Sequence, residues 1–140
     1  MRLRRSCRFI SYYKEGSLAG LSFTVEGRGM VFVLYLAVSE NIRSTGIGSE
    51  ILSYLKNLYG KPLTLNIEPM DDTADNADER RRRYSFYERN GFYNTGYLLR
   101  DTQMTYTVLS TAKDFLPDVY YETLLGIHPG GLGMPEILKK

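Results

Sequence analysis

The beginning of the chain carries short apolar runs separated by polar turns. Residues 9–13 and 18–25 are rich in aromatic and β-branched side chains, and Lys14-Glu15-Gly16-Ser17 lies between them. This composition predicts two strands joined by a tight turn. Residues 30–38 are apolar at almost every position, which predicts a central strand buried on both faces.

Two later segments have helical periodicity. From residue 47 the apolar side chains recur at helical spacing, at Ile47, Ile51, Leu55, Leu58 and Tyr59. Gly60 and Pro62 predict the end of this helix, because glycine tolerates a left-handed cap and proline cannot continue the hydrogen-bond ladder. A second helix is expected over residues 77–89, where Asn76 and Glu79 resemble a capping box.

The remaining segments complete a mixed sheet. Residues 63–67 are expected to form a strand, residues 96–99 and 103–109 a closing hairpin, and residues 117–125 a last short helix. The Gly-rich tail from His128 is expected to be loose. The order predicts a mixed α/β domain in which a hairpin leads into a crossover between neighbouring parallel strands.

Composition restricts the classes of function. At 140 residues the chain is the size of one domain, and its net charge of +2 is too small to indicate nucleic acid by itself. One cysteine and one histidine supply neither an intrachain disulfide nor a Cys/His zinc site, which fits a reducing compartment. The longest apolar run, residues 31–38, is too short to span a membrane, and no signal peptide is recognisable. We therefore expect a cytoplasmic protein without a metal or a membrane partner.

A glycine-containing turn between the apolar strand and the first helix is the most informative junction. It comprises Leu36, Ala37 and Val38 at the strand end and Arg43, Ser44, Thr45, Gly46, Ile47, Gly48 and Ser49 in the turn. Free N–H groups at a helix start carry partial positive charge and can cradle phosphate, and glycines let a ligand approach the backbone. No Gly-Lys-Ser/Thr follows, so the turn is not a P-loop, and Ile51 replaces the third glycine of a dinucleotide fingerprint.

The turn resembles that of the GNAT acetyltransferases, which reads Arg or Gln, two residues, Gly, any residue, then Gly or Ala. Arg43, Gly46 and Gly48 match it. Residues 86–92, Phe-Tyr-Glu-Arg-Asn-Gly-Phe, are similar to the closing helix of that family. The resemblance covers residues 9–109 and implies a mixed, mostly antiparallel sheet of the GNAT type in one domain, with residues 110–140 as a C-terminal extension. It also implies acetyl-CoA as co-substrate, held by the ten residues of the strand end and turn.

The resemblance further implies that the Tyr87 hydroxyl protonates the departing thiolate. The alternative is that Tyr87 and Tyr84 only form the apolar stripe of their helix. Transfer to an amine also requires loss of a proton from that amine, and Glu68, at the end of its strand, is the candidate base, directly or through water. An exposed strand terminus is the alternative for Glu68. Backbone N–H groups near Val38 are expected to stabilise the oxyanion.

The sequence departs from the family pattern in two places. Arg80 stands where many members have an asparagine, and a longer acidic loop, residues 70–78, precedes it. Only eight residues precede the first predicted strand, whereas the family usually begins with a strand and one or two helices that form a wall of the acceptor site. We expect these elements to be truncated, and the wall to come from the C-terminal segment or from a second subunit, unless the true start lies upstream. The apolar cluster available for this comprises Phe115, Leu116, Val119, Tyr120, Leu124 and Leu125.

The sequence thus predicts transfer of an acetyl group from acetyl-CoA to a primary amine of a small molecule or peptide, by direct attack in a ternary complex. A non-catalytic CoA-binding or protein-interaction module is the alternative. The run at residues 80–83 is interpreted as a solvated face, or as a partner of Asp71, Asp72, Asp75 or cofactor phosphates. The basic start, with Arg2, Arg4, Arg5 and Arg8, is a weaker indication of nucleic-acid binding, because no aromatic stacking platform accompanies it.

Overall fold

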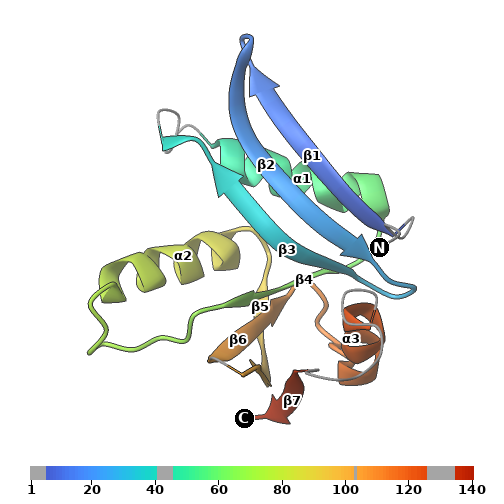
Figure 1. The fold of residues 1–140 in the computed structure, drawn as a ribbon, viewed down its shortest axis with the longest axis vertical. Coiled ribbons are helices and arrows are strands. Elements are labelled where there is room, and N and C mark those ends of the chain that lie inside the picture. The colour runs from blue at the N-terminus through green and yellow to red at the C-terminus, as the bar shows by residue number, and fades with distance from the viewer. Residues whose placement is uncertain (1–5, 41–45, 103, 126–134) are drawn as a thin grey trace.

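The computed structural model describes residues 6–40, 46–102, 104–125 and 135–140 (Figure 1). The elements in chain order are β1 (Cys7–Lys14), β2 (Ser17–Glu26), β3 (Val31–Val38), α1 (Ile47–Tyr59), β4 (Leu63–Ile67), α2 (Ala77–Arg89), β5 (Tyr93–Arg100), β6 (Thr105–Ser110), α3 (Pro117–Leu124) and β7 (Glu136–Lys139).

All the strands belong to one sheet in the order β1-β2-β3-β4-β6-β5-β7. Every neighbouring pair is antiparallel except β3 and β4, which are parallel. A parallel pair needs a crossover connection, and α1 supplies it. The predicted mixed, mostly antiparallel sheet with one crossover between parallel neighbours is therefore confirmed.

Two apolar clusters cover opposite faces of the sheet. Val31 and Val33 of β3 pack with α1 and Tyr87 of α2, whereas Phe32 between them packs with Tyr120 and Leu124 of α3. Successive side chains of a strand point to opposite faces. Helices α1 and α2 therefore lie on one face, called here the α1 face, and α3 lies on the other, called here the α3 face.

Strands β3 and β4 separate after a short paired stretch. Their register includes only Val31 with Leu63 and Phe32 with Thr64, so the two strands form a fork beyond that point. On the other side of β3, Thr24 pairs with Val33 but Phe23 pairs with Tyr35, which leaves Leu34 as the extra residue of a β-bulge.

The fork corrects the expected burial of β3. Residues 30–38 were predicted to be buried on both faces, but Leu34 and Tyr35 are 49% and 53% exposed. Loss of pairing with β4, together with the bulge, turns these side chains away from the core. The strand is central in the sheet order, and only its first half is fully buried.

Helices α1 and α2 and strand β4 have the predicted bounds, whereas β5 begins three residues before the predicted strand at residues 96–99. Gly60 caps α1 in the left-handed conformation, with φ 63°, and its N–H donates to the Lys56 carbonyl. The capping box at Asn76 is wrong, because the Asn76 side chain makes no cap hydrogen bond and bonds Arg80 and Glu68 instead. The tail was expected to be loose, but residues 136–139 form β7 and extend the sheet beside β5. His128 lies outside the described residues.

The C-terminal segment packs on its own chain. Tyr120 is 0% exposed and contacts Phe32 and Phe115, with ring centroids 5.8 Å and 5.6 Å away. Leu124 belongs to the same cluster as Val25 and Val108. The extension therefore covers the α3 face within one chain, and its expected part in the wall of the acceptor site stays a prediction.

Candidate active site

A cleft of about 260 Å³ lies in the fork between β3 and β4. Its walls are residues of β3, β4 and β6, the residue that follows β4, and two residues of α2. They are Val33, Leu34, Tyr35, Leu36, Leu65, Asn66, Ile67, Glu68, Arg83, Tyr87 and Tyr106. Some of these pack on the α1 face and Tyr106 packs on the α3 face, so side chains of both faces border the cleft where the strands part.

Backbone N–H groups of β3 point into this fork. The Val31 N–H donates to the Pro62 carbonyl on the β4 side, whereas the Ser39 N–H donates to the Ala19 carbonyl on the β2 side. These residues are an even number apart, and regular alternation would point both to the same side. The bulge at Leu34 reverses the alternation, so that the N–H groups of Leu36 and Val38 face the fork, where no residue of β4 pairs with them.

The start of α1 lies next to this end of β3. Gly46 precedes the helix with φ 84°, and the first helical bond runs from the Glu50 N–H to the Gly46 carbonyl, at 3.0 Å. The N–H groups of Ile47, Gly48 and Ser49 therefore have no helical acceptor, and no side chain caps them. Such a terminus favours an anion. Arg43, Ser44 and Thr45, which were also assigned to the cofactor, lie outside the described residues.

Gly48 is constrained by packing as well. A Cβ atom there would lie 2.8 Å from Cζ of Phe86 in α2 and 3.6 Å from Cγ2 of Val38. The glycine lets α2 approach the first turn of α1, and so brings the turn, the end of β3 and α2 together. Of the three predicted residues at the strand end, Leu36 lines the cleft, Val38 lies beside Gly48, and Ala37 pairs with Leu21 of β2.

Tyr87 lies in the cleft with only 8% of its surface exposed, between the rings of Phe86 and Phe92. Burial raises the pKa of Tyr87, and the nearby charge of Arg83 opposes part of this shift. Its hydroxyl has no hydrogen-bond partner among the described residues, yet no fully buried side-chain polar atom there lacks one. The hydroxyl therefore reaches the open space of the cleft. Tyr84, predicted as core, packs partly buried against the cluster of the α1 face.

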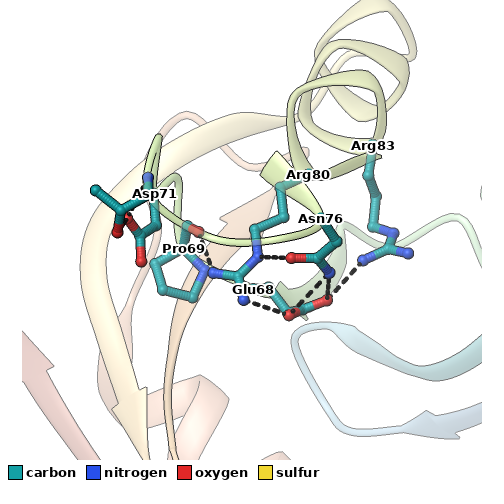
Figure 2. Close-up of polar contacts among 7 residues, drawn as sticks. Glu68, Pro69, Asp71, Asn76, Arg80 and Arg83 are labelled. Carbon is teal, nitrogen blue, oxygen red and sulfur yellow. Dashed lines mark hydrogen bonds and ion pairs between the residues drawn. The ribbon is translucent and has the colours of Figure 1, made fainter. Parts of the chain in front are cut away.

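Glu68 follows β4 and also lines the cleft, where donors from α2 surround its carboxylate (Figure 2). Arg80 Nη2 lies 2.8 Å from Oε2, and Arg83 Nη1 lies 3.2 Å from Oε1. The Asn76 amide nitrogen lies 3.3 Å and 3.5 Å from the two oxygens. Arg80 in turn donates to the Asn76 side chain and to the Pro69 carbonyl. The carboxylate thus holds α2 against the end of β4, in addition to any role toward a ligand.

The arginines at residues 80–83 differ in their partners. Arg80 and Arg83 bond Glu68, whereas Arg81 pairs with Asp72 and Asp78 at the surface. Pairing with Asp72 is as predicted, but Asp71 bonds Thr73 instead. The Thr73 bonds hold the pKa of Asp71 below its usual value.

The sequence did not identify several residues of the cleft. Asn66, Tyr106 and Arg83 line it, and none of them belongs to a recognisable motif. The alternation of β4 places Asn66 on the face opposite Leu65 and Ile67, which is the signal that identifies its side. No cluster of His, Cys, Asp or Glu suited to a metal exists in the described part of the chain. None of the described helices is long and apolar enough to cross a bilayer.

Comparisons with known proteins identify the family that has this architecture. The family model described as an acetyltransferase (GNAT) domain matches residues 5–94. The chain is 32% identical over 81 residues to "Putative acetyltransferase YjbC" of Bacillus subtilis (strain 168), a match that covers 58% of this chain and 40% of that protein. The matched part thus spans less than half the length of this curated relative.

Solved structures share the fold at low identity. A GNAT-family protein from Bacteroides thetaiotaomicron aligns with TM-score 0.65 and 18% identity, over 89% of this chain and 74% of that one. An aminoglycoside 6'-N-acetyltransferase complexed with coenzyme A aligns with TM-score 0.60 and 17% identity, over 76% of this chain and 72% of that one.

The mixed, mostly antiparallel sheet with one parallel pair is the architecture that these solved GNAT structures share. This chain belongs to the GNAT acetyltransferase family, because the family model matches well over half of its length. The resemblance based on the turn and on residues 86–92 is therefore confirmed, and so is the predicted fold class.

Proposed function

We propose that this protein transfers the acetyl group of acetyl-CoA to a primary amine of a small molecule or peptide, by direct attack in a ternary complex in the cytoplasm. One observation carries the proposal. The β3 N–H groups of Leu36 and Val38 face the fork, the hydroxyl of Tyr87 lies in the cleft there, and none of these donors has a partner among the described residues. Donors to an oxyanion and to a leaving group are the two kinds of group that thioester aminolysis uses.

The cofactor fits along the α1 face of the fork. The N–H groups of Ile47, Gly48 and Ser49 suit the pyrophosphate, and the free edge of β3 suits an extended chain that carries amides, as pantetheine does. The related aminoglycoside acetyltransferase structure contains coenzyme A, which supports this class of ligand. Arg43, Ser44 and Thr45 complete the proposed turn.

The chemistry follows from what each group of the chain can donate. Bound acetyl-CoA supplies an acetyl group activated as a thioester. The N–H groups of Leu36 and Val38 stabilise negative charge on the carbonyl oxygen while the amine nitrogen bonds to the acetyl carbon. Tyr87 donates to the sulfur as the carbon–sulfur bond breaks. Because burial raises the pKa of Tyr87, its hydroxyl stays protonated at neutral pH and remains a donor.

The amine must also lose a proton, which finally passes to solvent, and solvent returns a proton to Tyr87 after it has protonated the thiolate. Glu68 is a carboxylate of the cleft lining, but Arg80, Arg83 and Asn76 already donate to its oxygens. We therefore propose that the amine proton reaches Glu68 through a bound water molecule and not by direct contact between Glu68 and the amine. This assigns Glu68 a double role, in proton removal and in holding α2.

The test is release of CoA thiol. Purified protein is incubated with acetyl-CoA and a panel of primary amines and peptides, and the free thiol is followed with a chromogenic reagent. Amine-dependent thiol release, with a matching acetylated product by mass spectrometry, supports the proposal. Binding of CoA without release from any amine contradicts it and favours the non-catalytic CoA-binding module.

A further inference from the structure

A partly buried hydrogen bond connects helix α3 to the cleft. The Tyr120 hydroxyl donates to Oδ1 of Asn66 at 2.5 Å, across 54 residues of sequence. Tyr120 belongs to α3 and is fully buried, whereas Asn66 lies in β4, is half-buried and lines the cleft. The bond therefore fixes the orientation of a side chain that the cleft exposes.

Asn66 lies on the side of the sheet opposite Tyr87. Leu65 and Ile67, its neighbours in β4, pack in the cluster of the α1 face, and Tyr120 packs in the cluster of the α3 face. Tyr106, another residue of the lining, also packs against the α3 cluster. If the acyl donor occupies the α1 face beside Tyr87, the amine is left to enter from the α3 face, beside Asn66 and Tyr106.

The Asn66 amide has a donor to spare. Its Oδ1 is taken by Tyr120, and its Nδ2 has no hydrogen-bond partner among the described residues. A primary amide nitrogen only donates, so it cannot accept the N–H of an amine. Nor is it suited to hold the amine lone pair, which must stay free for attack. It suits an oxygen placed next to the amine.

We propose that Asn66 binds the carbonyl oxygen adjacent to the acceptor amine, and that the acceptor is an α-amino carbonyl compound such as the N-terminus of a peptide. Tyr120 is the positioning residue that aims the Asn66 amide. This inference rests on the proposed function and names the acceptor class of the same site. It also gives α3 a part in the acceptor wall, which the apolar cluster of the extension alone does not provide.

The experiment compares two amines of nearly equal shape in the CoA-bound protein, where no acetyl group is transferred. L-alaninamide carries the carbonyl, and butan-2-amine lacks it. Calorimetry at about pH 8, with each Kd referred to the concentration of the neutral amine, is expected to show that the wild type prefers L-alaninamide by about tenfold in Kd, the amount that one hydrogen bond contributes. Asn66→Leu should reduce this ratio to about one.

Tyr120→Phe keeps the ring in its pocket and removes only the hydroxyl that orients Asn66. It is expected to lower the preference several-fold while CoA affinity stays the same, a result that a merely structural bond between α3 and β4 would not produce. Tyr121→Phe is the matched control, because Tyr121 is the exposed neighbour on the same helix. It should keep the wild-type ratio.

The outcomes separate this inference from the proposed function. Equal affinity of the wild type for the two amines, or a preference that survives Asn66→Leu, overturns the assignment of Asn66. An undiminished preference in Tyr120→Phe overturns the positioning role. Failure of CoA itself to bind overturns the proposed function instead.

Discussion

Tyr87 shows how the surroundings of one residue determine what its side chain can do. Packing between Phe86 and Phe92 removes the ring from water, and the same burial raises the pKa of the phenol. The hydroxyl is thereby kept protonated, and the cleft is the space open to it. A buried donor that lacks a protein partner is available to a ligand.

Removing this hydroxyl should affect turnover and leave binding intact. Tyr87→Phe is expected to lower kcat by about 100-fold, because the donor acts on the leaving thiolate in the transition state. The Kd of acetyl-CoA should change by less than about twofold, since the ring remains. Initial rates and calorimetry measure the two quantities. An unchanged kcat would reduce Tyr87 to a packing residue of α2, which is the alternative reading of its position.

The wild-type pH profile gives an independent check on the same residue. Because burial raises the folded pKa of Tyr87 above the usual value of 10, this hydroxyl should stay mostly protonated up to that pH. The acetylation rate is expected to rise with pH toward the pKa of the amine acceptor, which is about 10.4 for an alkylamine. A fall in rate between about pH 8 and pH 10 while the protein stays folded would show that a different acid is required.

Packing against α2 is a second constraint that favours glycine at position 48. The sequence indicates close approach of a phosphate, and the structure adds that a Cβ would meet Phe86 at 2.8 Å. Gly48→Ala is therefore expected to destabilise the protein by about 1–3 kcal/mol through overpacking, even without ligand. Urea denaturation measures this, and Phe86→Leu in the same chain should recover part of the loss. If Phe86→Leu recovers nothing, the contact is not the cause.

At the scale of single residues, the sequence identified residues that belong to a family motif. It missed residues whose role depends on contacts with positions far away in the sequence. Tyr87 and Gly48 were identifiable because the family pattern fixes their positions. The pairing of Glu68 with Arg80 and Arg83 joins residues twelve and fifteen positions apart through the path of a loop. Asn66 acquires its role from Tyr120, which lies 54 positions later. No local pattern contains such information.

Among the elements, α3 carries the clearest energetic consequence. Leu124 is buried in the α3 cluster, whereas the next residue, Leu125, is exposed. Leu124→Ala should lower the free energy of unfolding by about 2–5 kcal/mol, because it leaves a cavity that the sheet cannot fill. Leu125→Ala is the control and should change it by less than about 0.5 kcal/mol. Equal effects on the urea midpoint would mean that α3 does not pack as described.

The elements also show where periodicity is informative. Helix α1 was predicted with its exact bounds because five apolar positions recur at helical spacing between a glycine turn and Gly60. The bulge at Leu34 was not predictable, since an extra residue in an apolar strand looks like any other residue. Strand β7 was missed because four residues after a glycine-rich stretch contain too little pattern, and its pairing with β5 is a tertiary contact.

At the scale of the whole molecule, buried tyrosines link stability to alkaline pH. Burial raises the pKa of Tyr12, Tyr87 and Tyr120 in the folded protein, whereas in the unfolded chain tyrosine ionises near pH 10. Above about pH 10 the unfolded state therefore binds fewer protons, and the free energy of unfolding falls as pH rises. Urea midpoints at about pH 8 and pH 10.5 should show this loss.

Tyr120→Phe provides the control for this prediction. One titrating group is then absent from both states, so the drop in stability between the two pH values should be smaller than in the wild type. A drop of the same size would assign the alkaline instability to other groups.

The association state of the chain stays a prediction. Helix α3 covers its face within one chain, so exchange of this helix between subunits is not needed to bury Tyr120. Strand β1 is nevertheless an edge of the sheet, and it exposes Phe9 and Tyr13. Light scattering should report about twice the chain mass of 16.1 kDa for a homodimer. A mass near that of one chain would exclude a homodimer at the concentration used.

The central claim is that acetyl-CoA occupies the fork between β3 and β4, and backbone amide NMR tests it most directly. On titration with acetyl-CoA, the largest chemical-shift changes should fall on the N–H groups of Leu36 and Val38 and on Ile47, Gly48 and Ser49 at the start of α1. A separate groove at the end of β2, lined by residues that include Ser6, Glu26 and Lys61, should shift little. Shifts concentrated in that groove, or none at saturating acetyl-CoA, would contradict the account.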